Sequence, residues 1–156
     1  MIDSRHQELS NDEIIEIAAQ NTGSQYSPEQ VLASLVAETR APETLTLRQG
    51  NTLFVIHRSK KDPSVAVFRA LNADTAPNYL ENSFIFTETM KSMGFRAMVS
   101  TFYDPTILNI FKYISRNPPF PGMGYKVQRT NDDGFYVTVN LGSQPGGLAS
   151  AKGQTQ

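Results

Sequence analysis

Side chains able to do acid–base, nucleophilic or metal chemistry are few and widely spaced in this sequence. It has two histidines, His6 and His57, and no cysteine, which excludes a thiol nucleophile and a cysteine metal site. It has no HxH or HExxH spacing and no Gly-x-Ser-x-Gly turn, the patterns that bring metal ligands or a serine nucleophile together. His57 stands at the end of a predicted strand, where a solvated histidine is the simpler interpretation. These residues therefore predict no catalytic residue and no metal site.

Two short charged segments have a local structural interpretation beside a functional one. Asp132 and Asp133 could form an acid–base pair, but they precede Gly134 in a turn, where acidic side chains hydrogen-bond to nearby backbone. The segment 58–61, Arg-Ser-Lys-Lys, could contact a phosphate, but it is also typical of a solvated hairpin tip. Neither segment is assigned to a site.

The elements that would position any site follow a definite order. Capping boxes at Ser10 and Ser27, each followed by apolar residues at helical spacing, predict two helices, over 11–20 and 28–39. Alternating apolar residues then predict a three-stranded meander, a long helix, a strand, a helix and a hairpin. These later segments are 44–47, 53–57, 65–71, 78–93, 95–102, 107–114, 125–129 and 135–141. The strand 95–102 is apolar on both faces, which predicts a central position with a layer on each side.

Length and composition set the class of protein. The 156 residues, 39% of them hydrophobic, predict a single domain over 1–141. The alternating order of helices and strands predicts the α/β class, with a mixed, largely antiparallel sheet flanked by helices. The glycine-rich and polar segment 142–156 has little to bury, which predicts a flexible tail.

Charge and hydropathy bear on partners and on location. Fourteen basic and 15 acidic side chains give a net charge of -1, so no nucleic-acid partner is indicated. No apolar run approaches 18 residues and the first residues do not resemble a secretory signal, so we expect a cytoplasmic protein with no membrane partner. Residues 1–40 are acidic, with seven Asp and Glu against two Arg, which indicates either solvated helix faces or a docking surface for a basic partner.

The order of elements resembles the GCN5-related N-acetyltransferase (GNAT) fold over about residues 10–141. In that family the segment after the central strand has an asparagine, an apolar residue three positions on, an aromatic residue four further and then a glycine-aromatic step. Asp104, Ile107, Phe111 and the pair Gly124-Tyr125 stand at those places here, after an extension at 117–123. The resemblance implies transfer of an acetyl group from acetyl-CoA to an amine.

The phosphate-binding loop of that family departs from the pattern in this sequence. The family uses Gln/Arg-x-x-Gly-x-Gly/Ala, in which the glycines let backbone N–H groups surround the diphosphate. The corresponding segment, 71–77, has no glycine and no arginine, Asp74 would repel a diphosphate, and Pro77 lacks an N–H. This departure predicts no cofactor and no cofactor-binding residue.

The proton donor of the family is also missing. The family's tyrosine, which protonates the departing thiolate, corresponds to Phe111, and phenylalanine has no proton to give. Tyr113 is two residues further along the helix and so points about 200 degrees away from Phe111.

Aromatic side chains crowd into 79–136, mainly as core residues, with the remainder in an exposed patch. The loop 117–123 is the best candidate for that patch, because prolines frame Phe120 and Met123 and a stiff loop loses little entropy when it docks. We therefore expect Phe120 and Met123 to contact a protein partner.

Three functional hypotheses follow. The first is a non-catalytic acetyltransferase-like protein that acts through protein contacts; such proteins resemble small bacteriophage products, some of them carried in the virion. The alternative is an active N-acetyltransferase, with acetyl-CoA held by the backbone of 72–76 and Tyr113 or Tyr103 as the acid. A third, a small-molecule binding module, predicts an apolar pocket near Phe68 and Phe95.

Overall fold

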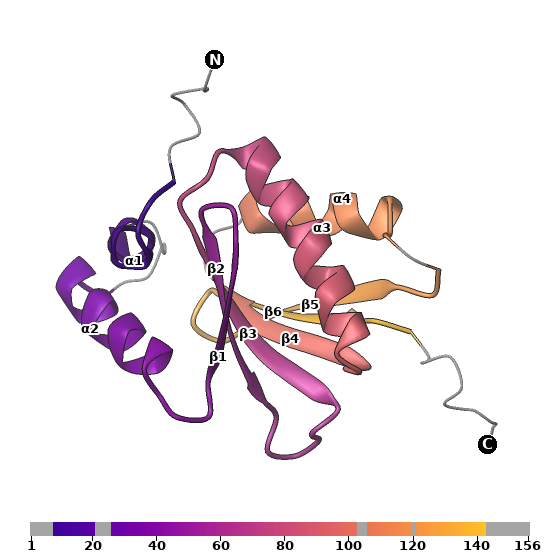
Figure 1. Cartoon of the computed structure of the whole chain (residues 1–156). Coiled ribbons are helices and arrows are strands. Elements are labelled where there is room, and N and C mark those ends of the chain that lie inside the picture. The colour runs from indigo at the N-terminus through magenta and orange to yellow at the C-terminus, as the bar shows by residue number, and fades with distance from the viewer. Residues whose placement is uncertain (1–7, 21–25, 103–105, 120, 143–156) are drawn as a thin grey trace.

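A mixed sheet of six strands, in the order β1-β2-β3-β4-β6-β5, forms the centre of the computed structural model (Figure 1). The structure describes residues 8–20, 26–102, 106–119 and 121–142. The strands are β1 (Leu45–Gln49), β2 (Thr52–Arg58), β3 (Val65–Asn72), β4 (Ala97–Phe102), β5 (Gly124–Arg129) and β6 (Phe135–Asn140). The helices are α1 (Asn11–Gln20), α2 (Pro28–Thr39), α3 (Ala76–Ser92) and α4 (Thr106–Arg116). The predicted α/β class and order of elements are confirmed, whereas the predicted tail beyond residue 142 lies outside the described residues.

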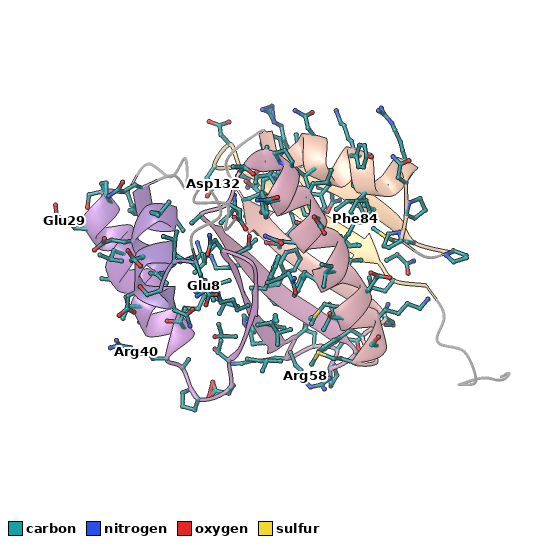
Figure 2. The ribbon with its side chains drawn as sticks, turned by 45° about the horizontal axis from the view of Figure 1, so that its top comes forward. Glu8, Glu29, Arg40, Arg58, Phe84 and Asp132 are labelled. Carbon is teal, nitrogen blue, oxygen red and sulfur yellow. The ribbon has the colours of Figure 1, made fainter. Side chains whose placement is uncertain are left out.

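Reciprocal capping boxes begin α1 and α2, as the sequence predicts. Ser10 N–H donates to Glu13 Oε1 (2.8 Å) and Glu13 N–H donates to Ser10 Oγ (3.1 Å). The bond from the Ser10 backbone stabilises the carboxylate and lowers the pKa of Glu13. Ser27 and Gln30 form the same pair of bonds at α2. Figure 2 shows Glu29 at the outer end of α2, where its side chain is exposed.

The two faces of the sheet have separate hydrophobic clusters. On one face Phe54 of β2 stacks on Phe86 of α3, with ring centroids 3.9 Å apart, and this cluster continues under α4. On the other face Val55 of β2 packs with residues of α1 and α2, including Ile14 and Leu35. Both faces of β2 are therefore buried. No helix in the described ranges is long and apolar enough to cross a membrane.

The strand β4 is central, between β3 and β6, as predicted. The prediction that it is covered on both faces is wrong at its end. Met98 and Ser100 are buried toward α3 and α4, but Thr101, on the opposite face, is exposed. The physical reason is that α1 packs against β2 and β3, so the helical layer on that face lies over the other half of the sheet.

The neighbouring strands β3 and β4 are parallel and separate along their length. Their paired positions run from Val65 with Ala97 to Val67 with Val99. Beyond that point β3 stays paired with β2 as far as Asn72, and β4 stays paired with β6 throughout. The carboxyl-terminal halves of β3 and β4 are therefore not paired with each other, although each stays paired with the strand on its other side. Two backbone edges thus face a gap inside the sheet.

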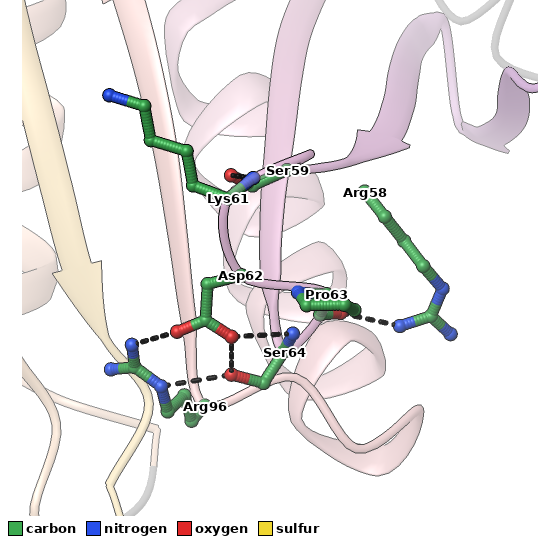
Figure 3. Close-up of polar contacts among 7 residues, drawn as sticks. All are labelled: Arg58, Ser59, Lys61, Asp62, Pro63, Ser64 and Arg96. Carbon is green, nitrogen blue, oxygen red and sulfur yellow. Dashed lines mark hydrogen bonds and ion pairs between the residues drawn. The ribbon is translucent and has the colours of Figure 1, made fainter.

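A polar cluster joins β3 and β4 at their amino-terminal ends (Figure 3). Asp62 accepts bonds from the Ser64 N–H (3.0 Å) and Oγ (2.6 Å), and it pairs with the Arg96 guanidinium. The Arg96 N–H donates to the Ser64 carbonyl at 2.9 Å. The Ser64 hydroxyl, helped by Arg96, lowers the pKa of Asp62 to about 2. The sheet is therefore held together at this end and open at the other.

Candidate functional site

A pocket of about 1130 Å³ occupies the gap between the separated halves of β3 and β4. Successive residues of a strand point to opposite faces of the sheet. Both sets line the pocket: Phe68, Ala70, Ser100 and Phe102 from the face of α3 and α4, and Arg69, Leu71 and Thr101 from the face of α1 and α2. The pocket therefore passes through the sheet and is lined from both faces.

Helices on both faces complete the walls. On one face α4 contributes Ile107, Ile110 and Phe111, and on the other α1 and α2 contribute Ile17, Ala18, Gln30, Val31 and Ser34. The Phe111 ring stacks on Phe102 with centroids 5.6 Å apart. The pocket is mostly apolar with a few hydrogen-bonding groups, the composition typical of small-molecule sites.

The segment 72–76, which we call the pocket loop, lies at one end of the pocket and leads into α3. The carboxylate of Asp74 is engaged: its Oδ2 accepts a bond from the Asn51 N–H (2.8 Å) and one from Asn82 Nδ2 (2.7 Å). Thr75 is the N-cap of α3 and makes no side-chain capping bond. In the described part of the chain, the amides of Thr75 and Ala76 donate to no group. The loop thus presents free N–H groups at the positive end of a helix dipole, although it has no glycine.

Pro77 stands at the second position of α3, within the first turn. The N–H groups of a first turn have no partner within the helix, so a proline there removes no helical bond. It does remove one donor that a phosphate could have used, as the sequence indicates.

The pocket wall has two charged side chains with different partners. Among the described residues that line the pocket, Arg69 and Asp74 are the charged ones. Arg69 Nη1 lies 3.0 Å from Glu38 Oε1 of α2, which offsets its charge. The donors to Asp74 are the neutral groups of Asn51 and Asn82, so its negative charge is hydrogen-bonded but not cancelled.

Residue 111, where the family that the sequence resembles has its tyrosine proton donor, is part of the pocket wall. Phe111 lines the wall with a ring that carries no hydroxyl. Tyr113 is 47% exposed and packs edge-on against Phe84 of α3, outside the pocket wall. Tyr103, the other candidate acid, lies outside the described residues, as does Asp104.

Residues with hydroxyl groups that the sequence did not single out also line the pocket. Tyr26 and Ser34 line it from the side of α1 and α2, and the buried Tyr79 lines it from α3. Tyr79 follows the apolar spacing of its helix and so reads as core, while the other two show no pattern at all. No short-range signal joins these residues, because the pocket gathers them from distant segments.

The other residues that the sequence singled out lie elsewhere. Met123 is partly buried against the core cluster under α4, and Phe120 lies outside the described residues, so a partner contact there remains a prediction. His57 is paired with Val67 in the sheet and does not line the pocket. Phe95 is buried beneath Arg58, with the guanidinium 4.7 Å from its ring, so Phe68 but not Phe95 faces the pocket.

The two charged turns follow their local interpretation. Asp132 and Asp133 lie exposed in the β5–β6 turn (Figure 2), where Asp133 has a φ of 64°. Arg58 donates to the Pro63 carbonyl at 2.7 Å within the β2–β3 turn (Figure 3). Across the described ranges, no three His, Asp or Glu side chains gather in a group that could hold a metal ion.

Two solved structures with a similar fold are acetyltransferases. Diaminobutyrate acetyltransferase EctA from Paenibacillus lautus, solved with L-2,4-diaminobutyric acid and coenzyme A, aligns with a TM-score of 0.50 and 12% identity over 87% of this chain and 92% of that chain. The ribosomal-protein-S18-alanine N-acetyltransferase from Escherichia coli aligns with a TM-score of 0.50 and 9% identity over 92% and 97%. No protein-family model and no curated protein matches the sequence. The predicted GNAT-like fold is confirmed, and identities this low establish the fold alone.

Proposed function

We propose that this protein is an N-acyltransferase that holds an acyl-CoA thioester in the pocket between β3 and β4 and passes the acyl group to an amine. The observation that carries this proposal is a single pocket lined from both faces of the sheet, at the free ends of two parallel strands. Such a pocket lets a donor and an acceptor approach each other from opposite sides. The GNAT-like fold supports the choice, since a neighbour with this fold was solved with coenzyme A.

The residues present fit coenzyme A in two respects. Its pantetheine arm is an extended chain with amide groups, and the edges of β3 beyond Val67 and of β4 beyond Val99 offer N–H and C=O groups to such a chain. Its phosphates suit the free amides of Thr75 and Ala76 at the start of α3. The Asp74 carboxylate accepts hydrogen bonds at Oδ2 from the Asn51 N–H and from Asn82 Nδ2.

A bound acyl-CoA supplies a thioester carbonyl as the acyl donor. The protein's part is to place that carbonyl and the amine together. Free N–H groups on the β3 edge can hydrogen-bond the carbonyl oxygen as negative charge develops on it. Gln30 and Ser34 offer hydrogen bonds to the acceptor on the side of α1 and α2, and the apolar Val31 beside them favours the uncharged amine. As the carbon–nitrogen bond to the amine forms and the carbon–sulfur bond breaks, Phe111 can give no proton to the sulfur, which would leave as a thiolate, and the proton that the amine loses would pass to solvent. A free cysteine thiol has a pKa of about 8.5, so a thiolate is an accessible leaving group near neutral pH.

A second candidate is the non-catalytic protein that acts through protein contacts. Phe111 favours it, because the ring fills the pocket wall without a proton donor. On this view the acidic helices α1 and α2 or the loop with Phe120 and Met123 bind a protein partner, and a virion role is one form of the same hypothesis. No observation in the described residues selects among these partners.

Calorimetry with coenzyme A and acetyl-CoA, followed by a thiol-release assay with a panel of primary amines, distinguishes the two. The acyltransferase proposal expects micromolar binding and amine-dependent thiol release. Binding without release for any amine would favour the second candidate, and no heat at millimolar coenzyme A would reject both the donor site and the enzyme. Ala70→Trp, in the pocket wall, should abolish binding, whereas the exposed Ala37→Trp on α2 is the matched control and should leave binding unchanged.

A further inference from the structure

A largely buried cluster of polar side chains, Thr52, Asn72 and Asn82, supports the pocket loop. Asn82 of α3 is 6% exposed, and its Nδ2 donates both to Asp74 Oδ2 (2.7 Å) and to Thr52 Oγ1 (3.0 Å). Thr52, which is fully buried, donates in turn to Asn72 Oδ1 at 2.9 Å. The Asn72 side chain binds the backbone of Asp74 in two places: its Oδ1 accepts the Asp74 N–H (3.0 Å), and its Nδ2 donates to the Asp74 carbonyl (3.1 Å). Four of the five bonds in this cluster end on Asn72 or Asp74, and the fifth joins Asn82 to Thr52.

The cluster continues outward to the first residues of α1. The Asn51 N–H donates to Asp74 Oδ2, and Asn51 Oδ1 accepts bonds from the Leu9 N–H (3.0 Å) and from Arg48 Nη2 (2.9 Å). Arg48 Nη1 donates to Asn11 Oδ1 of α1 at 2.8 Å. A continuous set of hydrogen bonds therefore runs from α3 through the pocket loop to α1. We call it the polar relay.

The β1–β2 turn is shaped to admit the relay. Gly50 has a φ of +57°, and a Cβ added there would lie 2.8 Å from Asp74 Oδ2 and 3.0 Å from Asn82 Nδ2. A side chain at this position would displace both groups. The glycine is required by the close approach of these side chains as well as by its backbone conformation.

The relay joins two walls of one pocket. Its inner end holds the pocket loop, from which Ala73, Asp74 and Ala76 line the pocket, and its outer end holds α1, which lines the pocket through Ile17 and Ala18. Asn82 and Arg48 do not line the pocket, so neither contacts a ligand in it. They act through Asp74 and Asn51, that is, as positioning residues.

We propose that the polar relay couples the position of the pocket loop to the position of α1, so that a structural change at either end alters the structure at the other. On the proposed function, on which this inference rests for its role in activity, the donor end and the acceptor end of the pocket are thereby linked. Coupling of this kind is reciprocal: a ligand that orders the loop must also order α1.

The first experiment needs no ligand and measures amide hydrogen exchange in the free protein. Asn82→Asp places a second carboxylate beside Asp74, and the repulsion should open the relay at its inner end. We expect exchange of the amides of residues 9–14 to become about fivefold faster or more, although the Asn82 amide bonds to Thr52 and Asp74 and not to that segment. The double variant Asp74→Asn/Asn82→Asp restores one carboxylate and one amide, and should return exchange toward that of the unmodified protein. Unchanged exchange at 9–14 in a folded Asn82→Asp variant would overturn the proposal.

A variant at the outer end keeps the proposal testable if Asn82→Asp does not fold. Arg48→Gln removes the bonds to Asn11 and Asn51, and the bond from Nε to the Gly50 carbonyl (2.8 Å), and should speed exchange in the pocket loop, residues 72–76. Arg58→Gln is the matched control, since Arg58 also donates to a backbone carbonyl but at the opposite end of the sheet. Equal effects of the two variants on the pocket loop would contradict a specific relay.

Adding coenzyme A then tests the link to activity. In the unmodified protein the coenzyme should slow exchange both in the pocket loop and at residues 9–14, and in Arg48→Gln the slowing at 9–14 should be smaller, because only the bond between the Leu9 N–H and Asn51 Oδ1 still joins that segment to the relay. Slowing at 9–14 that is equally large in Arg48→Gln would overturn the coupling. Failure of coenzyme A to bind would refute the proposed donor site, and the ligand-free measurement would still decide whether the relay exists.

Discussion

Removing the Asn82 side chain should destabilise the protein by an amount that can be worked out from its contacts. Asn82→Ala deletes the bonds to Thr52 and to the Asp74 carboxylate, while Thr52 keeps its bond to Asn72 and Asp74 keeps the Asn51 N–H. A neutral bond contributes about 1 kcal/mol and a bond to a charged group about 1.5–3 kcal/mol. Alanine recovers roughly 0.5 kcal/mol through its higher helix propensity. The free energy of unfolding should therefore fall by about 2–3.5 kcal/mol.

Urea unfolding followed by circular dichroism measures that loss, and a thermal scan should show Tm lower by about 4–14 °C for a chain of this size. Asn117→Ala is the matched control, because the exposed Asn117 donates one bond, to the Tyr113 carbonyl at 3.1 Å. It should cost less than about 0.5 kcal/mol. A loss of less than about 0.5 kcal/mol in Asn82→Ala would mean that water replaces the missing amide, and the relay would then not be a rigid support.

Three further predictions concern separate parts of the molecule. Phe111→Tyr restores a hydroxyl to the pocket wall and should raise the rate of acyl transfer at pH 7 about tenfold or more in the thiol-release assay; an unchanged rate would show that proton donation there does not limit the reaction. Asp62 has a pKa of about 2 in the folded protein against 3.8 ordinarily, so its contribution to stability is present above about pH 4 and disappears as the pH falls toward 2; acid unfolding of Asp62→Asn should differ from that of the unmodified protein above pH 4 and converge with it near pH 2. Gly50→Ala forces a Cβ against Asp74 and Asn82 and should lower the free energy of unfolding by about 1–3 kcal/mol, measured by urea unfolding, and a neutral effect would mean that the turn can relax.

The sequence predicts the elements well where local signals agree. Capping boxes at Ser10 and Ser27 place the starts of α1 and α2, because the capping bonds form between residues three apart. The turn with Gly134 and the alternation on either side of it place the last hairpin for the same reason. These contacts are short-range, and a short segment contains all the information they need.

The pocket and the polar relay are beyond that range. The gap depends on where the pairing of β3 with β4 stops, after Val67 and Val99, and no residue pattern marks the point. Asp74 reads in the sequence as a charge that would face a phosphate, because Asn51 and Asn82, 23 and eight residues away, cannot be identified as its partners without the fold. The missing glycines of the loop are visible in the sequence, but the free amides of the start of α3 are not.

The interrupted pairing of β3 with β4 has a mechanical consequence for the whole molecule. The sheet consists of two three-stranded blocks, β1-β2-β3 and β4-β6-β5, that share only the rungs joining residues 65–67 to 97–99. The ion pair of Asp62 with Arg96 joins the two blocks next to those paired residues. An extended ligand bound between the two blocks would supply the missing hydrogen bonds between β3 and β4. Ligand binding should therefore make the whole molecule more rigid and raise its melting temperature as the ligand concentration rises.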